Sequence, residues 1–220
     1  MPVKVKICGV RTPVIIETAA EAGADYVGLV LFPNSPRYVE LEEARVLAAI
    51  ARGRIGTVAV MVDPDDALID GVIERVRPDL LQLHGSETPA RVAAIKARAG
   101  LPVMKAVAIA GPADVAVAAA YAASADHILF DAKADPAAAL PGGNGVAFDW
   151  LALNGFAAPF ALSGGLTPET VGAAIRATGA ALVDVSSGVE RAPGDKDAEL
   201  VRNFISAAKS AASPTRAIAS

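Results

Sequence analysis

Residues 4–13 read KVKICGVRTP, and this stretch contains the only cysteine of the chain, Cys8. Its first half alternates with a period of two, so a strand would carry the two lysines and the thiol on one face and the valine and isoleucine on the other. Gly9 then turns the backbone toward a helical pattern over 13–22. A short strand, a turn and a helix form one unit, and the rest of the chain repeats that unit.

Cys8 ends this strand close to two ammonium groups. If helices cover the strand, its apolar face packs outward, and Lys4, Lys6 and Cys8 share the interior. An ammonium two residues from a thiol lowers the pKa of that thiol toward reactivity. An unpaired cysteine, however, is more often a small buried hydrophobe. The stretch alone therefore leaves both interpretations open.

Strand-like and helical patterns alternate along the whole chain. The strand-like runs are short and mostly apolar, as expected of strands covered on both faces, and lie at 3–8, 26–32, 55–62, 80–84, 103–109, 127–131, 159–163 and 182–186. The helical patterns lie at 13–22, 41–52, 64–76, 89–99, 113–122, 148–154, 168–178 and 196–212. Asp63, Thr88 and Thr167 each precede a proline that could begin a helix, and we expect them to cap those helices. Glycines at 23, 53, 100 and 179 mark helix ends.

Eight strand–helix units predict an α/β fold, a (β/α)₈ TIM barrel, with about 25 residues in each unit. The main alternative, a doubly wound open sheet, usually has fewer strands and a G-x-G-x-x-G fingerprint after the first strand, which this chain lacks. We expect a single catalytic domain over 1–212. The polar segment 213–220 has no periodicity and is expected to be a disordered tail.

The composition excludes several classes of protein. The net charge of −4 arises from mixed signs without a long basic block, so we expect no nucleic-acid partner. The mean hydropathy is +0.42, but no run of about 18 apolar residues lacks a charge or a turn signal, so we expect no membrane association. A single cysteine excludes a disulfide framework and favours a cytoplasmic location. Two histidines and one cysteine make a His/Cys metal cluster unexpected.

In a barrel, catalytic groups lie at the carboxyl ends of the strands and in the loops that follow. Two such loops are rich in glycine and serine: Ser163-Gly164-Gly165 after the seventh strand and Ser186-Ser187-Gly188 after the eighth. Free backbone N–H groups at these two places can hold a phosphate. The alternative is that the glycines only permit tight turns. We favour the phosphate site because both loops show the pattern.

Three further polar residues lie at strand ends. Asp131 ends the sixth strand among apolar neighbours, where desolvation favours the neutral acid and suits a general acid; a helix cap or a partner for Lys133 is the alternative. Asp184 on the eighth strand is expected to be a counter-charge for Lys4 or Lys6. His84, after the fourth strand, suits a hydrogen-bonded wall residue better than a catalyst. The Gly-rich segment 141–145 suits either a lid or a simple connection.

Read together, these residues resemble the phosphoribosylanthranilate isomerase family of tryptophan biosynthesis. The matching motifs span nearly the whole chain in the order of the family. They are Lys6-Ile7-Cys8-Gly9, Ser35-Pro36-Arg37, Leu81-Gln82-Leu83-His84-Gly85, Phe130-Asp131-Ala132, Gly142-Gly143-Asn144-Gly145, Phe148-Asp149-Trp150, Ser163-Gly164-Gly165-Leu166, Asp184-Val185-Ser186-Ser187-Gly188-Val189-Glu190, Pro193-Gly194 and Lys196-Asp197. Asn144 departs from the family, which more often has threonine or serine there.

The resemblance implies the Amadori rearrangement of N-(5-phosphoribosyl)anthranilate to 1-(2-carboxyphenylamino)-1-deoxyribulose 5-phosphate, without a cofactor or a metal. Cys8 would be the general base and Asp131 the general acid. The residues implied in substrate binding are Arg37, His84, Gly142, Gly143 and Asp184, with Gly164, Gly165, Ser187 and Gly188 at the phosphate. The implied partner is a small phosphosugar, and the implied assembly is a monomer or a homodimer.

Two other functions stay open at this point. The chain could be a phosphosugar-binding barrel without catalysis, which the presence of both Cys8 and Asp131 disfavours. It could also be a broader isomerase that acts on the analogous aminoaldose of histidine synthesis. Such enzymes rely on a pair of aspartates, at the first and the fifth or sixth strands, so Cys8 in the first strand argues against that alternative.

Overall fold

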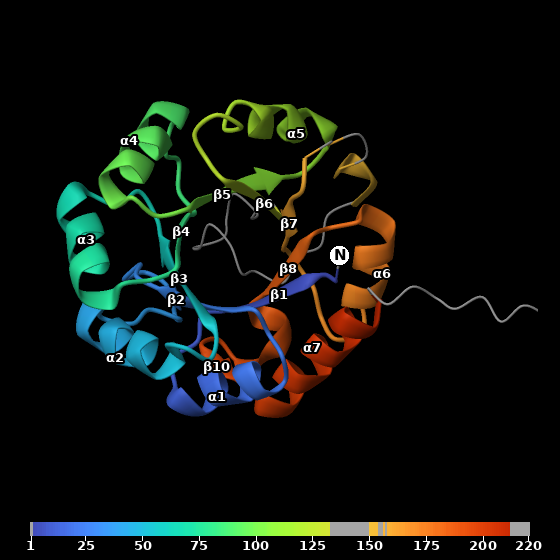
Figure 1. Ribbon diagram of the computed structural model, residues 1–220. Helices are drawn as coiled ribbons and strands as arrows, with labels where there is room; N and C mark the ends of the chain where they lie inside the picture. The colour runs from blue at the N-terminus through green and yellow to red at the C-terminus, as the bar shows by residue number, and fades with distance from the viewer. Residues whose placement is uncertain (1, 133–149, 154–155, 157, 212–220) are drawn as a thin grey trace, which may run out of the picture.

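A computed structural model describes residues 2–132, 150–153, 156 and 158–211. Eight parallel strands close into a barrel, each paired with the next in sequence and the last with the first, and helices surround this ring (Figure 1). The strands are β1 (Lys4–Cys8), β2 (Tyr26–Val30), β3 (Gly56–Met61), β4 (Leu80–Leu83), β5 (Val103–Ile109), β6 (His127–Ala132), β7 (Ala161–Leu162) and β8 (Leu182–Val185). The predicted (β/α)₈ barrel is confirmed.

The helices follow the strands in the expected order. They are α1 (Pro13–Glu21), α2 (Leu41–Ala51), α3 (Asp66–Gly71) continued by a π-helical turn (Val72–Val76), α4 (Pro89–Ala99), α5 (Pro112–Ala119), a 3₁₀ turn (Trp150–Leu153), α6 (Val171–Thr178), a 3₁₀ turn (Ser187–Val189) and α7 (Ala198–Ala211). Two short antiparallel strands, β9 (Glu190–Ala192) and β10 (Asp195–Lys196), lie between β8 and α7. The predicted tail at 213–220 lies outside the described residues.

Two of the three predicted helix caps are wrong. Thr88 caps α4, since its side chain accepts a hydrogen bond from the N–H of Arg91. The helix after β3 begins later than expected, at Asp66, and Asp65 caps it. The backbone at Asp63 has φ +44°, and its carboxylate accepts hydrogen bonds from Ser86 instead.

Thr167 does not cap α6 either. The residues after it form a turn, in which the side chain of Thr170 accepts a hydrogen bond from the N–H of Thr167. The helix itself begins at Val171, three residues later than predicted. At Thr167 the proline that follows does not begin the helix. A turn over residues 167–170 comes first, and α6 starts after it.

The period of two in the strands separates two apolar layers. Outward side chains such as Val5, Ile7 and Val183 join the large cluster between the strands and the helices. Inward side chains form a smaller cluster that fills the barrel, and it contains Cys8, Val58 and Leu129. The interior is therefore a packed core, and reactive groups can only gather at its open end.

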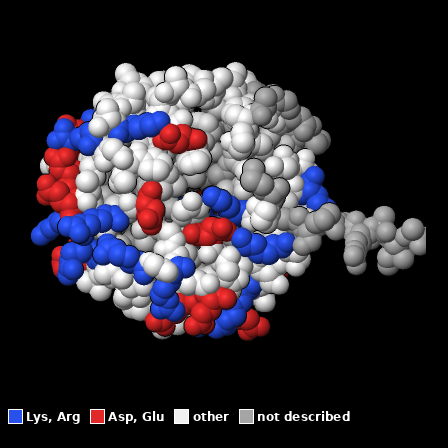
Figure 2. Space-filling model, viewed as in Figure 1, with Lys and Arg blue, Asp and Glu red and all other residues white. Residues whose placement is uncertain are grey.

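Charged side chains of both signs are interleaved over α1, α2 and α3, whereas the side formed by α5 shows few of them (Figure 2). Several form ion pairs between neighbouring helices: Arg98 on α4 contacts Asp66 and Asp70 on α3, and Arg91 contacts Asp66. Exposed pairs of this kind contribute little to stability, because water and salt screen them. None of the helices in the described part of the chain has the length and apolar content needed to cross a membrane.

Candidate active site at the carboxyl ends of the strands

Lys6 lies on β1 in register with Asp184 on β8. Nζ of Lys6 donates a hydrogen bond of 2.9 Å to Oδ1 of Asp184, and both side chains are buried. The expected counter-charge is therefore confirmed, with Lys6 as the partner. Lys4 was also expected inside the barrel, but it is exposed, and its Nζ lies 5.7 Å from the centroid of the Tyr26 ring. The difference arises because Lys4 begins the strand, at the edge of the barrel.

Of the two interpretations of Cys8 that the sequence left open, burial weighs more than the neighbouring ammonium groups. Burial raises the pKa of Cys8 above its ordinary value, and the attraction of Lys6 and Lys196 offsets this only in part. Burial also lowers the pKa of Lys6, but Asp184 and Cys8 outweigh it, so the pKa of Lys6 lies above its ordinary value. Lys6 therefore remains an ammonium, and it is the main group that favours the thiolate.

Gly28 on β2 leaves room for the thiol of Cys8. A Cβ atom at position 28 would lie 3.0 Å from Sγ of Cys8 and 3.2 Å from Cε of Lys6. A side chain there would displace the thiol or the ammonium. Sequence analysis assigned no role to Gly28, although a glycine within an apolar strand often marks such a close approach.

Arg37, in the loop after β2, contacts the carboxylate of Glu190 on β9. Nε and Nη2 of Arg37 donate to Oε1 and Oε2 of Glu190, each at 2.8 Å. Lys196 on β10 also contacts Glu190 and donates to the hydroxyl of Ser186. That hydroxyl in turn donates to the backbone carbonyl of Cys8 at 3.2 Å. A continuous set of polar contacts therefore links Arg37 to the end of β1.

This group of charges is buried, so it is not a surface ion pair. Burial raises the pKa of Glu190, but Arg37 and Lys196 outweigh it and hold that pKa below its ordinary value. Burial lowers the pKa of Lys196, and Glu190 offsets this only in part. Gly9 lets Arg37 approach, since a Cβ at position 9 would lie 2.6 Å from Cδ of Arg37. Sequence analysis missed Glu190 and Lys196, whose only signal was their place in the family motifs.

Asp131 lies at the end of β6, with its carboxyl group held by two donors. Oδ1 accepts a hydrogen bond of 3.0 Å from the N–H of Ala132, and Oδ2 lies 3.2 Å from Nε2 of His84. Nδ1 of His84 lies 3.0 Å from the side-chain nitrogen of Gln82 on β4. His84 is thus a hydrogen-bonded wall residue, as predicted, and it links Gln82 to Asp131.

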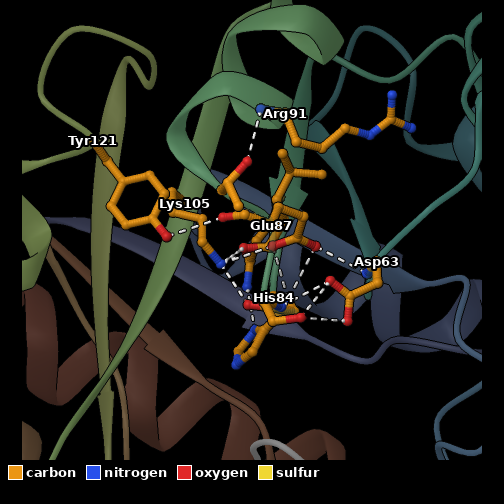
Figure 3. Close-up of polar contacts among 11 residues, drawn as sticks. Asp63, His84, Glu87, Arg91, Lys105 and Tyr121 are labelled. Carbon is orange, nitrogen blue, oxygen red and sulfur yellow. Dashed lines mark hydrogen bonds and ion pairs between the residues drawn. The ribbon is translucent and has the colours of Figure 1, made fainter.

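The loop that carries His84 is fixed by a buried acid, Glu87. Figure 3 shows Glu87 between Lys105 and Asp63, with contacts to both. Oε2 of Glu87 lies 2.8 Å from Nζ of Lys105, and Oε1 accepts hydrogen bonds from the N–H groups of Asp63 and Gly85. Lys105 also donates to the carbonyl of Gly85. Glu87 and Lys105 therefore fix the backbone directly after His84. The only sign of this pair in the sequence is a lysine within an apolar strand.

The loops after β7 and β8, where the sequence predicts a phosphate site, are closely packed. Gly164 and Gly165 have φ values of +90° and +62°, which favour glycine. A Cβ at Gly164 would lie 2.6 Å from the backbone nitrogen of Ala132, and a Cβ at Gly188 would overlap the carbonyl of Leu166. Gly164 therefore packs the loop after β7 against the end of β6, and Gly188 packs the loop after β8 against the loop after β7.

Not all predicted site residues can be placed. Gly142 and Gly143 lie outside the described residues. Among the residues that the structure does describe, no group of three or more histidine, cysteine or acidic side chains could hold a metal ion. Cys8, Arg37, His84, Asp131 and Asp184 all lie at or near the carboxyl ends of the strands.

Comparison with known proteins identifies relatives over almost the entire chain. The family model described as N-(5'phosphoribosyl)anthranilate (PRA) isomerase matches residues 5–207. The chain is 54% identical over 211 residues to the N-(5'-phosphoribosyl)anthranilate isomerase of Paramagnetospirillum magneticum, covering 95% of this chain and 98% of that one. It is 56% identical over 211 residues to that of Rhodopseudomonas palustris, covering 95% and 97%.

Solved structures agree with the sequence comparison. The phosphoribosyl anthranilate isomerase of Thermotoga maritima superposes with a TM-score of 0.85 at 35% identity, covering 94% of this chain and 99% of that one. A phosphoribosyl anthranilate isomerase in complex with reduced 1-(o-carboxyphenylamino)-1-deoxyribulose 5-phosphate superposes with a TM-score of 0.83 at 34% identity, with the same coverage. Since the family model, the relatives and these folds all coincide over the barrel that carries Cys8 and Asp131, the chain belongs to the N-(5'-phosphoribosyl)anthranilate isomerase family.

Proposed function

We propose that this chain catalyses the Amadori rearrangement of N-(5'-phosphoribosyl)anthranilate to 1-(2-carboxyphenylamino)-1-deoxyribulose 5-phosphate in tryptophan biosynthesis. Family membership over residues 5–207 supports the activity. The observation that carries the mechanism is that a thiol on β1 and a carboxyl group on β6 both lie at the carboxyl end of one barrel. One acid and one base at a common site suit an isomerisation.

Asp131 would act first, as the general acid. It would protonate the ring oxygen of the ribose, so that the C–O bond breaks and the ring opens to a Schiff base. The carboxylate left behind keeps two hydrogen-bond donors, the N–H of Ala132 and Nε2 of His84. Donors aimed at a developing charge stabilise the transition state.

Cys8 would act second, as the general base. Its thiolate would take the proton from C2, and the electrons of that bond would move toward the iminium nitrogen to give an enolamine, which tautomerises to the ketone. The iminium nitrogen accepts the electrons, so the proposed route uses no cofactor. Lys6 supports this step, because its ammonium offsets part of the rise in the pKa of Cys8 that burial causes.

The two ends of the substrate would be held on either side of these groups. The loops with Gly164, Gly165, Ser187 and Gly188 suit the phosphate, since they follow the seventh and eighth strands, where barrels of this kind hold phosphates with backbone N–H groups. Arg37 suits the anthranilate carboxylate, because a guanidinium pairs well with carboxylates and already binds one here, that of Glu190. Asp184, His84, Gly142 and Gly143 complete the proposed substrate contacts.

The assembly and the location are part of the proposal. We place the enzyme in the cytoplasm, as a monomer or a homodimer that binds a small phosphosugar. A related structure from Thermotoga maritima is described as monomers generated from a dimeric enzyme. Sedimentation at several concentrations separates the two assemblies. Cys8 and Asp131 both lie on the barrel of a single chain, so either assembly can contain a working site.

The decisive test is turnover of freshly prepared N-(5'-phosphoribosyl)anthranilate, followed by the loss of its fluorescence. The wild-type protein should convert it, and Cys8→Ala and Asp131→Asn should each lower kcat by at least about 10²-fold. Cys8→Ser, which keeps the size of the side chain, should be similarly impaired. Near-wild-type turnover in Cys8→Ala would show that the base is misassigned. Binding of a phosphosugar without any turnover by the wild type would favour a binding protein.

A further inference from the structure

Gln82 is the only glutamine of the chain, and the mechanism above gives it no part. Its side chain is fully buried on β4, facing the interior next to Met104 of β5. The nitrogen Nε2 lies 3.0 Å from Nδ1 of His84. The oxygen Oε1 is buried and meets no hydrogen-bond partner among the described residues. Natural proteins seldom leave such an oxygen unsatisfied, so its position requires an explanation.

The orientation of this amide fixes the protonation of the imidazole. An amide nitrogen can only donate, so Nδ1 of His84 must accept and carries no hydrogen. The hydrogen of the neutral ring then lies on Nε2, which faces Oδ2 of Asp131 at 3.2 Å. Turning the amide over would satisfy Oε1 but would leave two amide hydrogens without an acceptor. In a neutral ring it would also put the hydrogen on Nδ1 and aim a bare nitrogen at the carboxylate.

We propose that Gln82 is a positioning residue that selects the Nε2–H tautomer of His84 and thereby supplies the donor that Asp131 needs when it releases its proton. This inference rests on the proposed role of Asp131 as the general acid. Gln82 itself does not touch the reacting atoms. The proton that goes to the ring oxygen comes from Asp131, and the electron pair of the broken O–H bond stays on the carboxylate. The hydrogen on Nε2 stays on His84 throughout and strengthens its bond to Oδ2 as the charge forms.

Glu87 and Gln82 act on different parts of His84. Glu87 fixes the backbone after His84, since its carboxylate accepts from the N–H of Gly85. The position of the ring is therefore set by the loop, whereas its tautomer is set by Gln82. This division predicts that replacing Gln82 changes catalysis with little effect on the binding of the substrate.

The first experiment reads the tautomer directly in the resting protein. The chain has two histidines, so His127→Asn, a change at an exposed residue outside the site, leaves His84 as the only imidazole. Nitrogen-15 spectra of that variant should show hydrogen on Nε2 and none on Nδ1. A scalar coupling across the hydrogen bond should join Nδ1 to the side-chain nitrogen of the only glutamine. Hydrogen on Nδ1, or no coupling to the amide nitrogen, would overturn the proposal.

The second experiment measures catalysis. Gln82→Met keeps the size of the side chain but removes the donor, and it should lower kcat by about 10- to 100-fold while KM changes by less than about twofold. Gln82→Glu, which can only accept at Nδ1, should also shift hydrogen onto Nδ1 in the nitrogen-15 spectrum. Met104→Leu is the matched control, because it changes the neighbouring interior residue without touching the hydrogen bonds, and its kcat should stay within about twofold.

A double-mutant cycle separates an effect through His84 from a loss of packing. Since Gln82 acts through His84, adding Gln82→Met to His84→Asn should lower kcat by less than about twofold further. Full additivity of the two losses would overturn the proposal. These experiments also distinguish the role of Gln82 from that of Asp131. Retained turnover in Asp131→Asn would refute the assignment of Asp131 as the general acid. The wrong tautomer of His84, together with an inactive Asp131→Asn, would refute only the role of Gln82.

Discussion

The ammonium of Lys6 lies 2.9 Å from Oδ1 of Asp184, and neither side chain is open to solvent. The register of β1 against β8 brings the two groups together from opposite ends of the chain. A buried cation needs such a partner, since an unpaired charge in the interior is strongly destabilising. The same ammonium also attracts the thiolate form of Cys8. One ion pair thus stabilises the barrel and tunes the proposed base.

Replacing Lys6 should therefore affect stability and chemistry together. Lys6→Met leaves Asp184 buried without a counter-charge, and the free energy of unfolding should fall by about 3–5 kcal/mol. The pKa of Cys8 should rise further, because its nearest cation is lost. Urea denaturation measures the first effect, and the rate of alkylation of Cys8 measures the second. Lys4→Met on the same strand is the control and should change stability by less than about 0.5 kcal/mol. Equal stability of both variants would contradict the argument.

The reactivity of Cys8 should rise steadily into the alkaline range. Because burial raises the pKa of Cys8, its thiolate fraction at neutral pH is smaller than that of an ordinary thiol, whose pKa is about 8.5. Iodoacetamide reports this directly, since the chain has no other cysteine. The rate of modification should still be rising at the pH where a free thiol levels off. A plateau at or below neutral pH would mean that Lys6 and Lys196 outweigh burial.

Arg37→Ala should mainly weaken binding of the substrate. If the guanidinium pairs with the anthranilate carboxylate, its loss should raise KM by about 10-fold or more, with a smaller change in kcat. Steady-state kinetics measures both constants. Arg45→Ala, on the exposed side of α2, should leave KM unchanged. Since Arg37 also binds Glu190, the variant must be shown to fold by circular dichroism. An unchanged KM in a folded variant would remove the proposed role of Arg37.

Gly164→Ala should weaken both the phosphate site and the fold. The residue has φ +90°, and an added Cβ would lie 2.6 Å from the backbone nitrogen and the Cβ of Ala132. Gly53→Ala is the matched control, because Gly53 has φ +77° but nothing lies within 4 Å of its added Cβ. The control isolates the backbone strain of about 1–2 kcal/mol. In urea denaturation, Gly164→Ala should lower the free energy of unfolding more than Gly53→Ala does. It should also raise KM. Equal losses of stability in the two variants would contradict the proposal.

The sequence located the strands well because each apolar run is short and ends at a turn signal. It placed the helix starts less well. Asp63 has the pattern of a cap before a proline, yet its carboxylate binds Ser86 in the next loop of the barrel. A local pattern could not show that competing partner, because it lies 23 residues away.

The residues next to Cys8 in the sequence were also not enough to predict the pKa of its thiol. Lys6 is two residues from the thiol, and this favoured a lowered pKa, but the degree of burial depends on all eight strands. The outcome is a raised pKa, since desolvation exceeds the attraction of the ammonium. Gln82 stood out in the sequence only as a member of the motif at 81–85, because nothing in the sequence shows where an amide points.

By itself, the sequence determined the barrel, the order of its eight units and the positions of Cys8 and Asp131, since a period of two and the turn residues after each strand act over short distances. Only the tertiary structure decided which charged groups are partners, including the choice of Lys6 over Lys4 for Asp184. Lys6 with Asp184, Arg37 with Glu190 and Lys105 with Glu87 are all set by the closure of the sheet and the register of its strands. The first of these pairings also keeps Lys6 charged, and its ammonium favours the thiolate of Cys8, to which we assign the role of general base.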